Sequence, residues 1–342
     1  MSRRDFLKAS VAAGVVAPSL VACTSMDRTS SAVSSDPEAL HEFRWSESSI
    51  DDLQAAMGSG ELTALELTRD YVGRIEALDW GGPRVNSIIE VNPDAEAIAR
   101  TLDQERVEGH IRGPLHGIPI VLKDCIATDD GMETTAGSLA LVGSKVPRDA
   151  GVVTKLREAG AIILGKANMS EWNAFRGFPS RGGWSGRAGM GLNPYALSYS
   201  TGDSSSGSAA AVAANFAVGA VGLETYGSII MPASLCSVVG LRPTMGLISR
   251  SGTIPISVTR DTTGPMTRTV GDLAAMLGVM AGVDPLDPVT RRSVGRVPSD
   301  YRRFLDPDGL RGARIGVWRS SHVWKDGHVA GVVEPLISVL ED

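Results

Sequence analysis

The positions of apolar residues along the chain predict a succession of helices and strands that begins near Ile50. Apolar residues at helical spacing follow acidic or hydroxyl-bearing starts, whereas short continuous apolar runs are typical of buried strands. Helices are expected at Asp51–Met57, Leu62–Leu78, Pro93–Arg106, Val152–Ala159, Val270–Met280 and Val329–Leu340. Strands are expected at Val85–Val91, Ile118–Leu122, Ala161–Asn168 and Ala313–Val317. This mixture of elements predicts an α/β protein.

The stretch Ser200–Thr244 carries two hydroxyl-bearing turns that flank a small-residue helix pattern and a short apolar strand pattern. A helix of about 10 residues rises ~15 Å, and a strand can cover the same distance on its return. The chain can therefore bring Ser204 and Ser228 to the same end of a sheet, where two hydroxyls could act together.

Such a pair of serines needs a base, and none of the five histidines stands in a recognisable catalytic context. Lys123 ends the apolar run Ile118–Leu122, where partial desolvation would lower its pKa and favour the neutral amine. Serine–lysine pairs are a known variant of the catalytic triad. A solvated lysine at a strand end is the alternative.

Four motifs recur in the order and spacing of a known family. They are GIPIVLKD (Gly117–Asp124), TTAGSLAL (Thr134–Leu141), the serine-glycine stretch, and ETYGSI followed by VVGLRPTMGLISRSGTIPIS (Glu224–Ser257). Together they resemble the amidase signature family from about Ile50 to about Val283, and are most similar to its peptide-amidase-like branch. The resemblance implies a three-layer α/β/α fold around a mixed central sheet.

The resemblance also implies a Lys–cis-Ser–Ser triad, with Lys123 as base, Ser204 as bridging serine and Ser228 as nucleophile. The oxyanion hole would be formed by the N–H groups of Thr225, Tyr226, Gly227 and Ser228. Supporting roles are expected for Thr134, Ser138 and Ser205, the first two by hydrogen bonds that orient Lys123. The loop Arg260–Met266 is expected to close against the site. The implied reaction, which uses no cofactor, hydrolyses carboxylic or C-terminal peptide amides to acid and ammonia or amine.

Two residues depart from the family pattern. Asp203 stands where glycine usually precedes the bridging serine, and its charge would favour the protonated form of Lys123. Tyr226 stands where the branch usually has aspartate, and its ring would crowd the acyl pocket or stack on a substrate.

The first 49 residues precede the domain expected at residues 50–342. Residues 1–23 resemble a twin-arginine export signal, with Arg3 and Arg4 ahead of an apolar stretch too short to span a bilayer. Leu20–Cys23 resembles a lipoprotein cleavage site and predicts a lipidated Cys23 that tethers an exported, periplasmic or envelope protein to a membrane. A simple cleaved signal with an incidental cysteine is the alternative. Residues 24–49 are expected to form a Ser-rich tether and lead-in.

Composition narrows the partners. The chain has 33 Lys and Arg against 39 Asp and Glu, a net charge of −6, which argues against nucleic acid as a partner. No set of ligands at metal-binding spacing accompanies His322 and His328. Cys125 and Cys236 lie in apolar contexts and are expected in the core, with a disulfide between them as the alternative. The oligomeric state is not predicted.

Two other functions stay open. One is a glutamine-hydrolysing component like that of the tRNA-linked amidotransferase, although the export signal argues against that cytoplasmic reaction. The other is a catalytically impaired remnant or binding scaffold, which Asp203 and Tyr226 favour. Family members continue beyond the position of Asp342, so the C-terminal part of the domain is expected to be missing.

Overall fold

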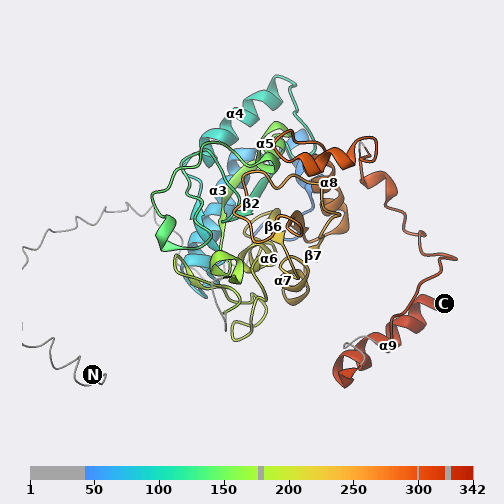
Figure 1. Ribbon diagram of the computed structural model, residues 1–342. Helices are drawn as coiled ribbons and strands as arrows, with labels where there is room; N and C mark the ends of the chain where they lie inside the picture. Colours follow the sequence, from blue (N-terminus) through green and yellow to red (C-terminus); the bar gives the residue numbers. More distant parts are fainter. Residues whose placement is uncertain (1–42, 176–180, 299, 320–324, 342) are drawn as a thin grey trace, which may run out of the picture.

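A computed structural model describes residues 43–175, 181–298, 300–319 and 325–341. A mixed six-stranded sheet with the order β1-β3-β2-β6-β8-β7 forms its centre (Figure 1). Strand β2 pairs in parallel with β3 and β6, while β1, β8 and β7 pair antiparallel with their neighbours. The strands are β1 (Ile88–Val91), β2 (Pro119–Lys123), β3 (Ile162–Ala167), β6 (Gly219–Glu224), β7 (Val239–Gly240) and β8 (Thr262–Thr267), with a separate hairpin of β4 (Trp184–Ser185) and β5 (Gly189–Met190). The predicted mixed sheet is confirmed.

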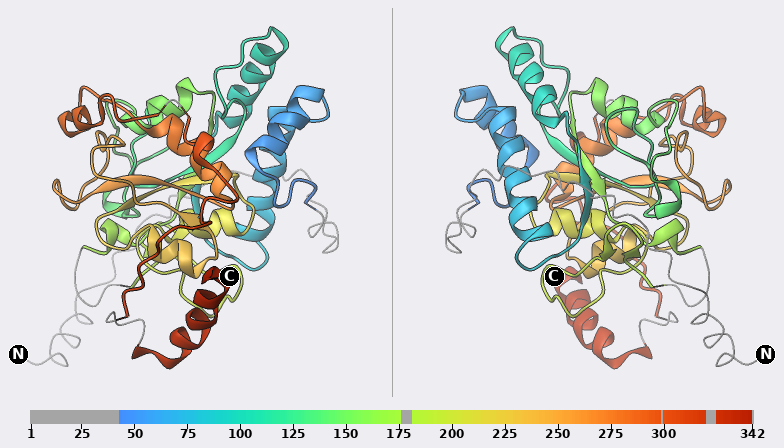
Figure 2. Two further views of the ribbon diagram at one scale, coloured as in Figure 1. Left: turned by 90° about the vertical axis from the view of Figure 1, so that its right-hand side faces the viewer. Right: turned by 90° about the vertical axis from the view of Figure 1, so that its left-hand side faces the viewer.

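Helices cover both faces of this sheet, as a three-layer fold requires (Figure 2). One face carries α6 (Ser206–Ala213) and α7 (Ile230–Leu235), and the opposite face carries α5 (Gly151–Glu158) and α8 (Val270–Met280). The remaining helices are α2 (Ile50–Ser59), α3 (Ala64–Arg74), α4 (Ala95–Val107) and α9 (Gly327–Glu341). The three-layer prediction is therefore confirmed.

Local sequence signals fix the starts of the first two helices. Ser49 and Asp52 form a reciprocal capping box at α2, and Thr63 and Glu66 form another at α3. The helix expected to run to Leu78 changes at Ile75 into a π-helical segment that ends at Trp80. This segment lets the buried Asp79 carboxylate accept hydrogen bonds from the residues that lead into β1.

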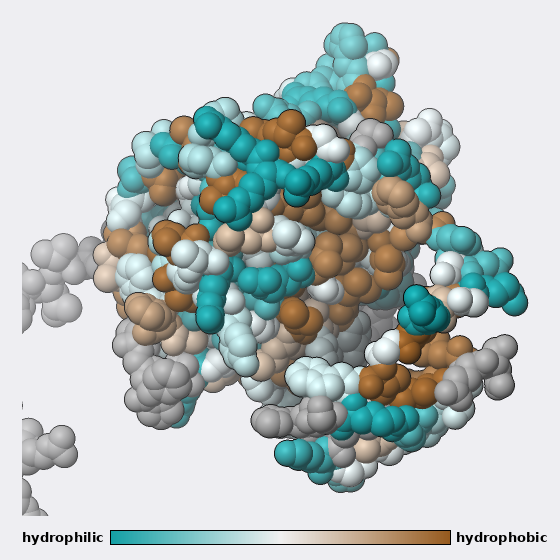
Figure 3. All heavy atoms as spheres, turned by 45° about the vertical axis from the view of Figure 1, so that its right-hand side comes forward, coloured by the Kyte–Doolittle hydropathy of each residue, from teal (hydrophilic) through white to brown (hydrophobic). Residues whose placement is uncertain are grey.

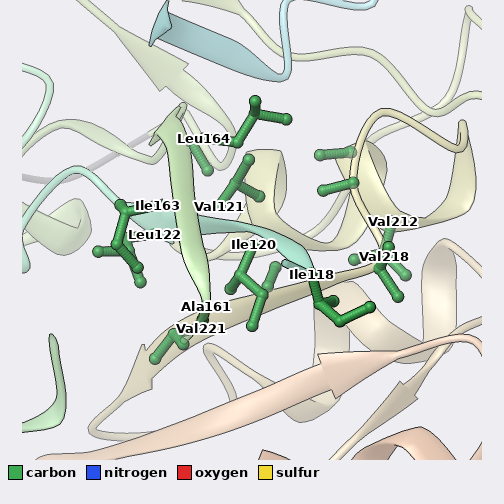
Figure 4. Close-up of a cluster of buried hydrophobic side chains, with 14 of the residues drawn as sticks. Ile118, Ile120, Val121, Leu122, Ala161, Ile163, Leu164, Val212, Val218 and Val221 are labelled. Atoms are coloured by element: carbon green, nitrogen blue, oxygen red, sulfur yellow. The ribbon is translucent and has the colours of Figure 1, made fainter. Parts of the chain in front are cut away.

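The core forms where β2 lies between its two parallel neighbours. Figure 4 shows Ile118, Ile120 and Leu122 among side chains of β3, β6 and α6, and all three are fully buried. A continuous apolar run is the pattern of a strand covered on both faces. The same burial extends to Lys123, the last residue of β2, which is also 0% exposed.

Two predictions about the later part of the chain are wrong. The segment expected to be a closing loop, Arg260–Met266, contains most of the buried strand β8, which pairs with β6 over six residues. Gly264 and Pro265 hide it, because both residues are disfavoured in central strands. The strand expected at Ala313–Val317 is an unpaired exposed segment, since no strand edge lies beside it among the described residues.

Helix α9 stands apart from the rest of the protein (Figure 1). Val332, Leu336 and Val339 on this helix are exposed, and Figure 3 shows apolar surface on it and on the neighbouring body. None of the helices in the described ranges has the length and apolar character of a membrane span. Cys125 and Cys236 are buried and free, so the alternative of a disulfide between them is wrong. The predicted signal and Cys23 lie outside the described residues.

The contact between α6 and the end of β3 gives a stability prediction. A Cβ on Gly207 would lie 2.4 Å from backbone atoms of Asn168 and Ser87, which cannot move aside as a flexible side chain could. Gly207→Ala should lower the free energy of unfolding by about 2–3 kcal/mol. Gly73→Ala is the matched control, because its Cβ meets nothing within 4 Å in α3 and should raise stability by up to about 1 kcal/mol. Urea denaturation midpoints measure both changes, and equal effects would contradict the packing described here.

Candidate active site

Lys123 lies at the end of β2, directly beneath the serine-rich stretch. Its Nζ donates one hydrogen bond to Ser204 Oγ at 2.7 Å and another to the Leu223 carbonyl at 2.9 Å. Both acceptors are uncharged, and the side chain is 0% exposed. A buried amine with only neutral partners in contact has little to hold its positive charge.

Burial lowers the pKa of Lys123 from its usual 10.5 to about 8. Acidic groups at greater distance oppose this shift, with Cys125, Asp203, Asp261 and Glu224 contributing in that order. A pKa near 8 leaves about one molecule in ten with a neutral amine at pH 7, and most molecules neutral above pH 8. The amine can therefore accept a proton in the range where its ordinary counterpart cannot.

The serine-rich stretch is tied to the end of β6 by Ser205. Ser205 Oγ donates to the Leu223 carbonyl at 3.2 Å and accepts from the Leu223 N–H at 3.3 Å. Its own N–H donates to the Ser228 carbonyl at 3.2 Å. The two turns that carry Ser204 and Ser228 thus lie side by side, as the helix-and-return arrangement predicted.

The turn from Thr225 to Ser228 is organised by a buried carboxylate that sequence reasoning missed. Glu224 Oε1 accepts from the Gly227 N–H at 2.8 Å, and Oε2 accepts from the Ile229 and Ile230 N–H groups at 2.7 and 3.0 Å. Arg242 lies 3.5 Å from the same carboxylate. An acidic residue at the end of an apolar strand, three residues before a glycine, was the available signal.

A second missed carboxylate, Asp261, holds the same turn from the other side. Thr225 Oγ1 donates to Asp261 Oδ1 at 2.5 Å, while the Ile256 and Ser257 N–H groups donate to Oδ2. Asp261 therefore fixes the turn and the segment Gly252–Ser257 together. No local pattern announces this role, because 36 residues separate Thr225 from Asp261.

The expected oxyanion donors are only partly available in this geometry. The Gly227 N–H is already engaged by Glu224, so it does not fit the role that the sequence suggested. The N–H groups of Thr225, Tyr226 and Ser228 have no acceptor among the described residues. The Tyr226 ring is 85% exposed, so it does not crowd the turn.

The turn at Thr134–Ser138 does not orient Lys123 by hydrogen bonds, and that prediction is wrong. Thr134 Oγ1 accepts from Lys166 Nζ at 2.9 Å, and Ser138 Oγ accepts from the Ala140 N–H at 3.4 Å. The turn is held instead by Asp124, whose Oδ2 accepts from Thr135 Oγ1 and the Gly137 N–H. Its connection with Lys123 is therefore through the backbone of the next residue.

Lys166 is a second fully buried lysine, and burial lowers its pKa to about 8 as well. It ends an apolar run in β3 much as Lys123 ends β2, so this sequence pattern alone names two candidate bases. Their partners separate them. Lys166 Nζ donates to the Ile126 carbonyl and to Thr134, whereas Lys123 reaches Ser204.

The hydrogen bonds of the buried His116 lead away from the serines. Its Nε2 lies 2.9 Å from the Leu102 carbonyl, and its Nδ1 accepts from the Arg112 N–H. Burial lowers the pKa of His116, so this imidazole stays neutral and serves the packing around it. The described residues hold no group of three or more side chains arranged to bind a metal.

Comparison with known proteins places this geometry in a family. The profile of the family described as Amidase matches residues 66–342. The native peptide amidase of Stenotrophomonas maltophilia superposes with a TM-score of 0.84 at 51% identity, over 87% of this chain and 60% of that one.

Two sequence relatives show the breadth of that family. A probable amidase of Arabidopsis thaliana is 45% identical over 84% of this chain and 56% of its own length. A glutamyl-tRNA(Gln) amidotransferase component of Halorhodospira halophila is 41% identical over 85% of this chain and 58% of its own length. The chain thus spans little more than half the length of these relatives.

The geometry of Lys123 gives a pH prediction. If the neutral amine activates Ser228, labelling of Ser228 by a fluorophosphonate should rise about tenfold per pH unit below pH 8 and level off above it. The sign follows because a base acts only when deprotonated. Mass spectrometry of the labelled peptide measures the rate, and a flat profile between pH 6 and 9 would contradict the assignment.

Asp203→Asn provides the control for this profile. Its carboxylate raises the pKa of Lys123, so its removal should shift the midpoint to lower pH by less than about one unit. A shift to higher pH would show that another group controls the labelling.

Proposed function

Because the chain belongs to the amidase family, we propose that it hydrolyses carboxylic or C-terminal peptide amides through a Lys123–Ser204–Ser228 triad. The observation that carries the proposal is the 2.7 Å hydrogen bond between the buried Lys123 amine and Ser204, beside the turn that ends at Ser228. The peptide amidase at 51% identity supports the substrate class. The products are a carboxylic acid and ammonia or an amine.

Proton transfer in this proposal runs from Ser228 through Ser204 to Lys123. Ser204 passes its own proton to the neutral amine as it takes the proton of Ser228, because a hydroxyl donates and accepts at once. Ser228 Oγ then bonds to the amide carbon and gives a tetrahedral oxyanion. The protonated relay returns a proton to the leaving nitrogen, which departs as the amine. Water repeats the sequence on the acyl-enzyme and releases the acid.

The oxyanion is assigned to the free N–H groups of the turn that ends at Ser228. Thr225 and Tyr226 are the two donors before Gly227, whose N–H is held by Glu224. The fixed turn keeps these donors in place before the charge develops, which is how such sites lower the barrier. Each donor is expected to contribute about 10²–10³-fold to the rate.

An amidotransferase component is the second candidate, supported by the relative from Halorhodospira halophila at 41% identity. That relative is named for glutamyl-tRNA(Gln), so the two functions separate on substrate. We favour the hydrolase because the first 23 residues resemble an export signal, which would remove the chain from cytoplasmic tRNA. An impaired scaffold is the third candidate, and the variants below distinguish it.

A set of three substitutions tests the triad. Ser228→Ala and Lys123→Ala should each lower kcat on simple amides by at least about 10³-fold, because the nucleophile or its base is lost. Ser208→Ala is the matched control, since Ser208 lies in α6 one turn from Ser204 and its Oγ bonds only the Val221 carbonyl. Ammonia release and circular dichroism measure activity and folding. A folded wild-type protein that neither turns over amides nor labels at Ser228 would favour the scaffold.

We also propose that the chain is exported and tethered to a membrane through a lipidated Cys23. The proposal rests on the paired Arg3 and Arg4 and on the Leu20–Cys23 motif, which lie outside the described residues. Cys23→Ser should leave amidase activity unchanged and move the protein from the membrane fraction to the soluble periplasmic fraction. Metabolic labelling with a radioactive fatty acid measures the modification. Equal labelling of both forms would refute it.

A further inference from the structure

Asp203 is a charged residue beside the catalytic groups that the mechanism does not use. It is bonded through the backbone to Ser204, whose Oγ accepts from Lys123. The side chain is partly buried, yet its carboxylate has no hydrogen bond or ion pair within the described ranges. A carboxylate next to a buried site and without a partner is costly unless a cation joins it during function.

The other carboxylates whose charge reaches Lys123 are already satisfied. Asp261 accepts from Thr225 and from two backbone N–H groups, and Glu224 accepts from three N–H groups and lies near Arg242. Asp203 is therefore the acidic side chain of this set that still has its full capacity to bind a cation.

An aromatic ring stands on the neighbouring turn. Tyr226 precedes Ser228 by two residues, and its side chain is 85% exposed. The hydrogen bond between Ser205 N–H and the Ser228 carbonyl holds this turn beside the one that carries Asp203. A carboxylate and an open aromatic face that border the same serine pair are the two groups that recognise organic cations.

We propose that Asp203 and Tyr226 form a subsite for a cationic group on the amide substrate. The inference rests on the proposed hydrolase function and narrows its substrate class to amides with a positive charge near the scissile carbonyl. Asp203 would supply the opposite charge and Tyr226 the face of its ring. In this role the aspartate gains substrate affinity at the same time as it opposes the loss of charge from the lysine beneath it.

Two amides of the same shape separate the roles of charge and size. Trimethylglycine amide carries a permanent positive charge, and 3,3-dimethylbutanamide replaces the charged nitrogen by carbon. Because neither substrate titrates, both can be assayed at pH 9, where Lys123 is largely neutral in every variant. The measured quantity is the ratio of kcat/KM for the charged amide to kcat/KM for the neutral one. Intrinsic reactivity cancels when this ratio is compared between enzymes.

Asp203→Asn should lower the ratio about five- to tenfold, and Tyr226→Leu should lower it about threefold, while Tyr226→Phe keeps the ring and the ratio. A change in the pKa of Lys123 would alter both substrates alike and leave the ratio unchanged. In the wild-type enzyme, rising salt concentration should also lower the ratio, because screening weakens attraction to a partly exposed charge. This measurement keeps the inference testable if a variant fails to fold.

Each outcome decides one question. A ratio that stays within about twofold in Asp203→Asn and does not respond to salt, with both amides hydrolysed, overturns the cation subsite and leaves the hydrolase intact. Failure of the folded wild-type protein to hydrolyse either amide or any other simple amide contradicts the proposed function, and the subsite with it.

Discussion

A lysine amine without charge compensation, held inside the protein, is the constraint on which the site depends. Lys123 reaches this position because β2 is buried between β3 and β6 along its whole length. Its two contacts, Ser204 Oγ and the Leu223 carbonyl, can each accept a proton in a hydrogen bond but cannot neutralise an ammonium ion. The fold therefore gives up stability to keep a base close to neutral, as functional sites commonly do.

Buried carboxylates around this amine serve the backbone rather than the lysine. Glu224 and Asp261 fix the turn before Ser228, and Asp124 fixes the turn that follows β2. Each carboxylate accepts several N–H or O–H donors, and this arrangement satisfies its charge locally. Because these acids are occupied, they tighten the turns while they only partly oppose the low pKa of Lys123. Rigidity of the turns and reactivity of the amine thus come from the same arrangement.

Much of this arrangement could be predicted from short sequence patterns. The apolar run before Lys123, the two serines 24 residues apart and the capping boxes at Ser49 and Thr63 are local signals, and they act locally in the structure. The motifs also indicated the family, which the comparisons confirm.

Other parts depend on contacts between distant residues and could not be predicted in this way. Strand β8 contains Gly264 and Pro265, and only its pairing with β6 makes it a strand. Thr134 bonds Lys166 rather than Lys123, a choice decided by how β2 and β3 lie side by side. The segment Ala313–Val317 has strand-like residues but no neighbouring strand in the described part of the chain, so its pattern alone was misleading.

The most direct test of the account is a titration of the Lys123 amine itself by NMR, with 13C label at lysine Cε. The account predicts two lysine resonances with a pKa near 8, one of which disappears in Lys123→Met and the other in Lys166→Met. If the resonance lost in Lys123→Met titrates near 10.5 like a surface lysine, the amine is charged under working conditions and the proposed base is wrong.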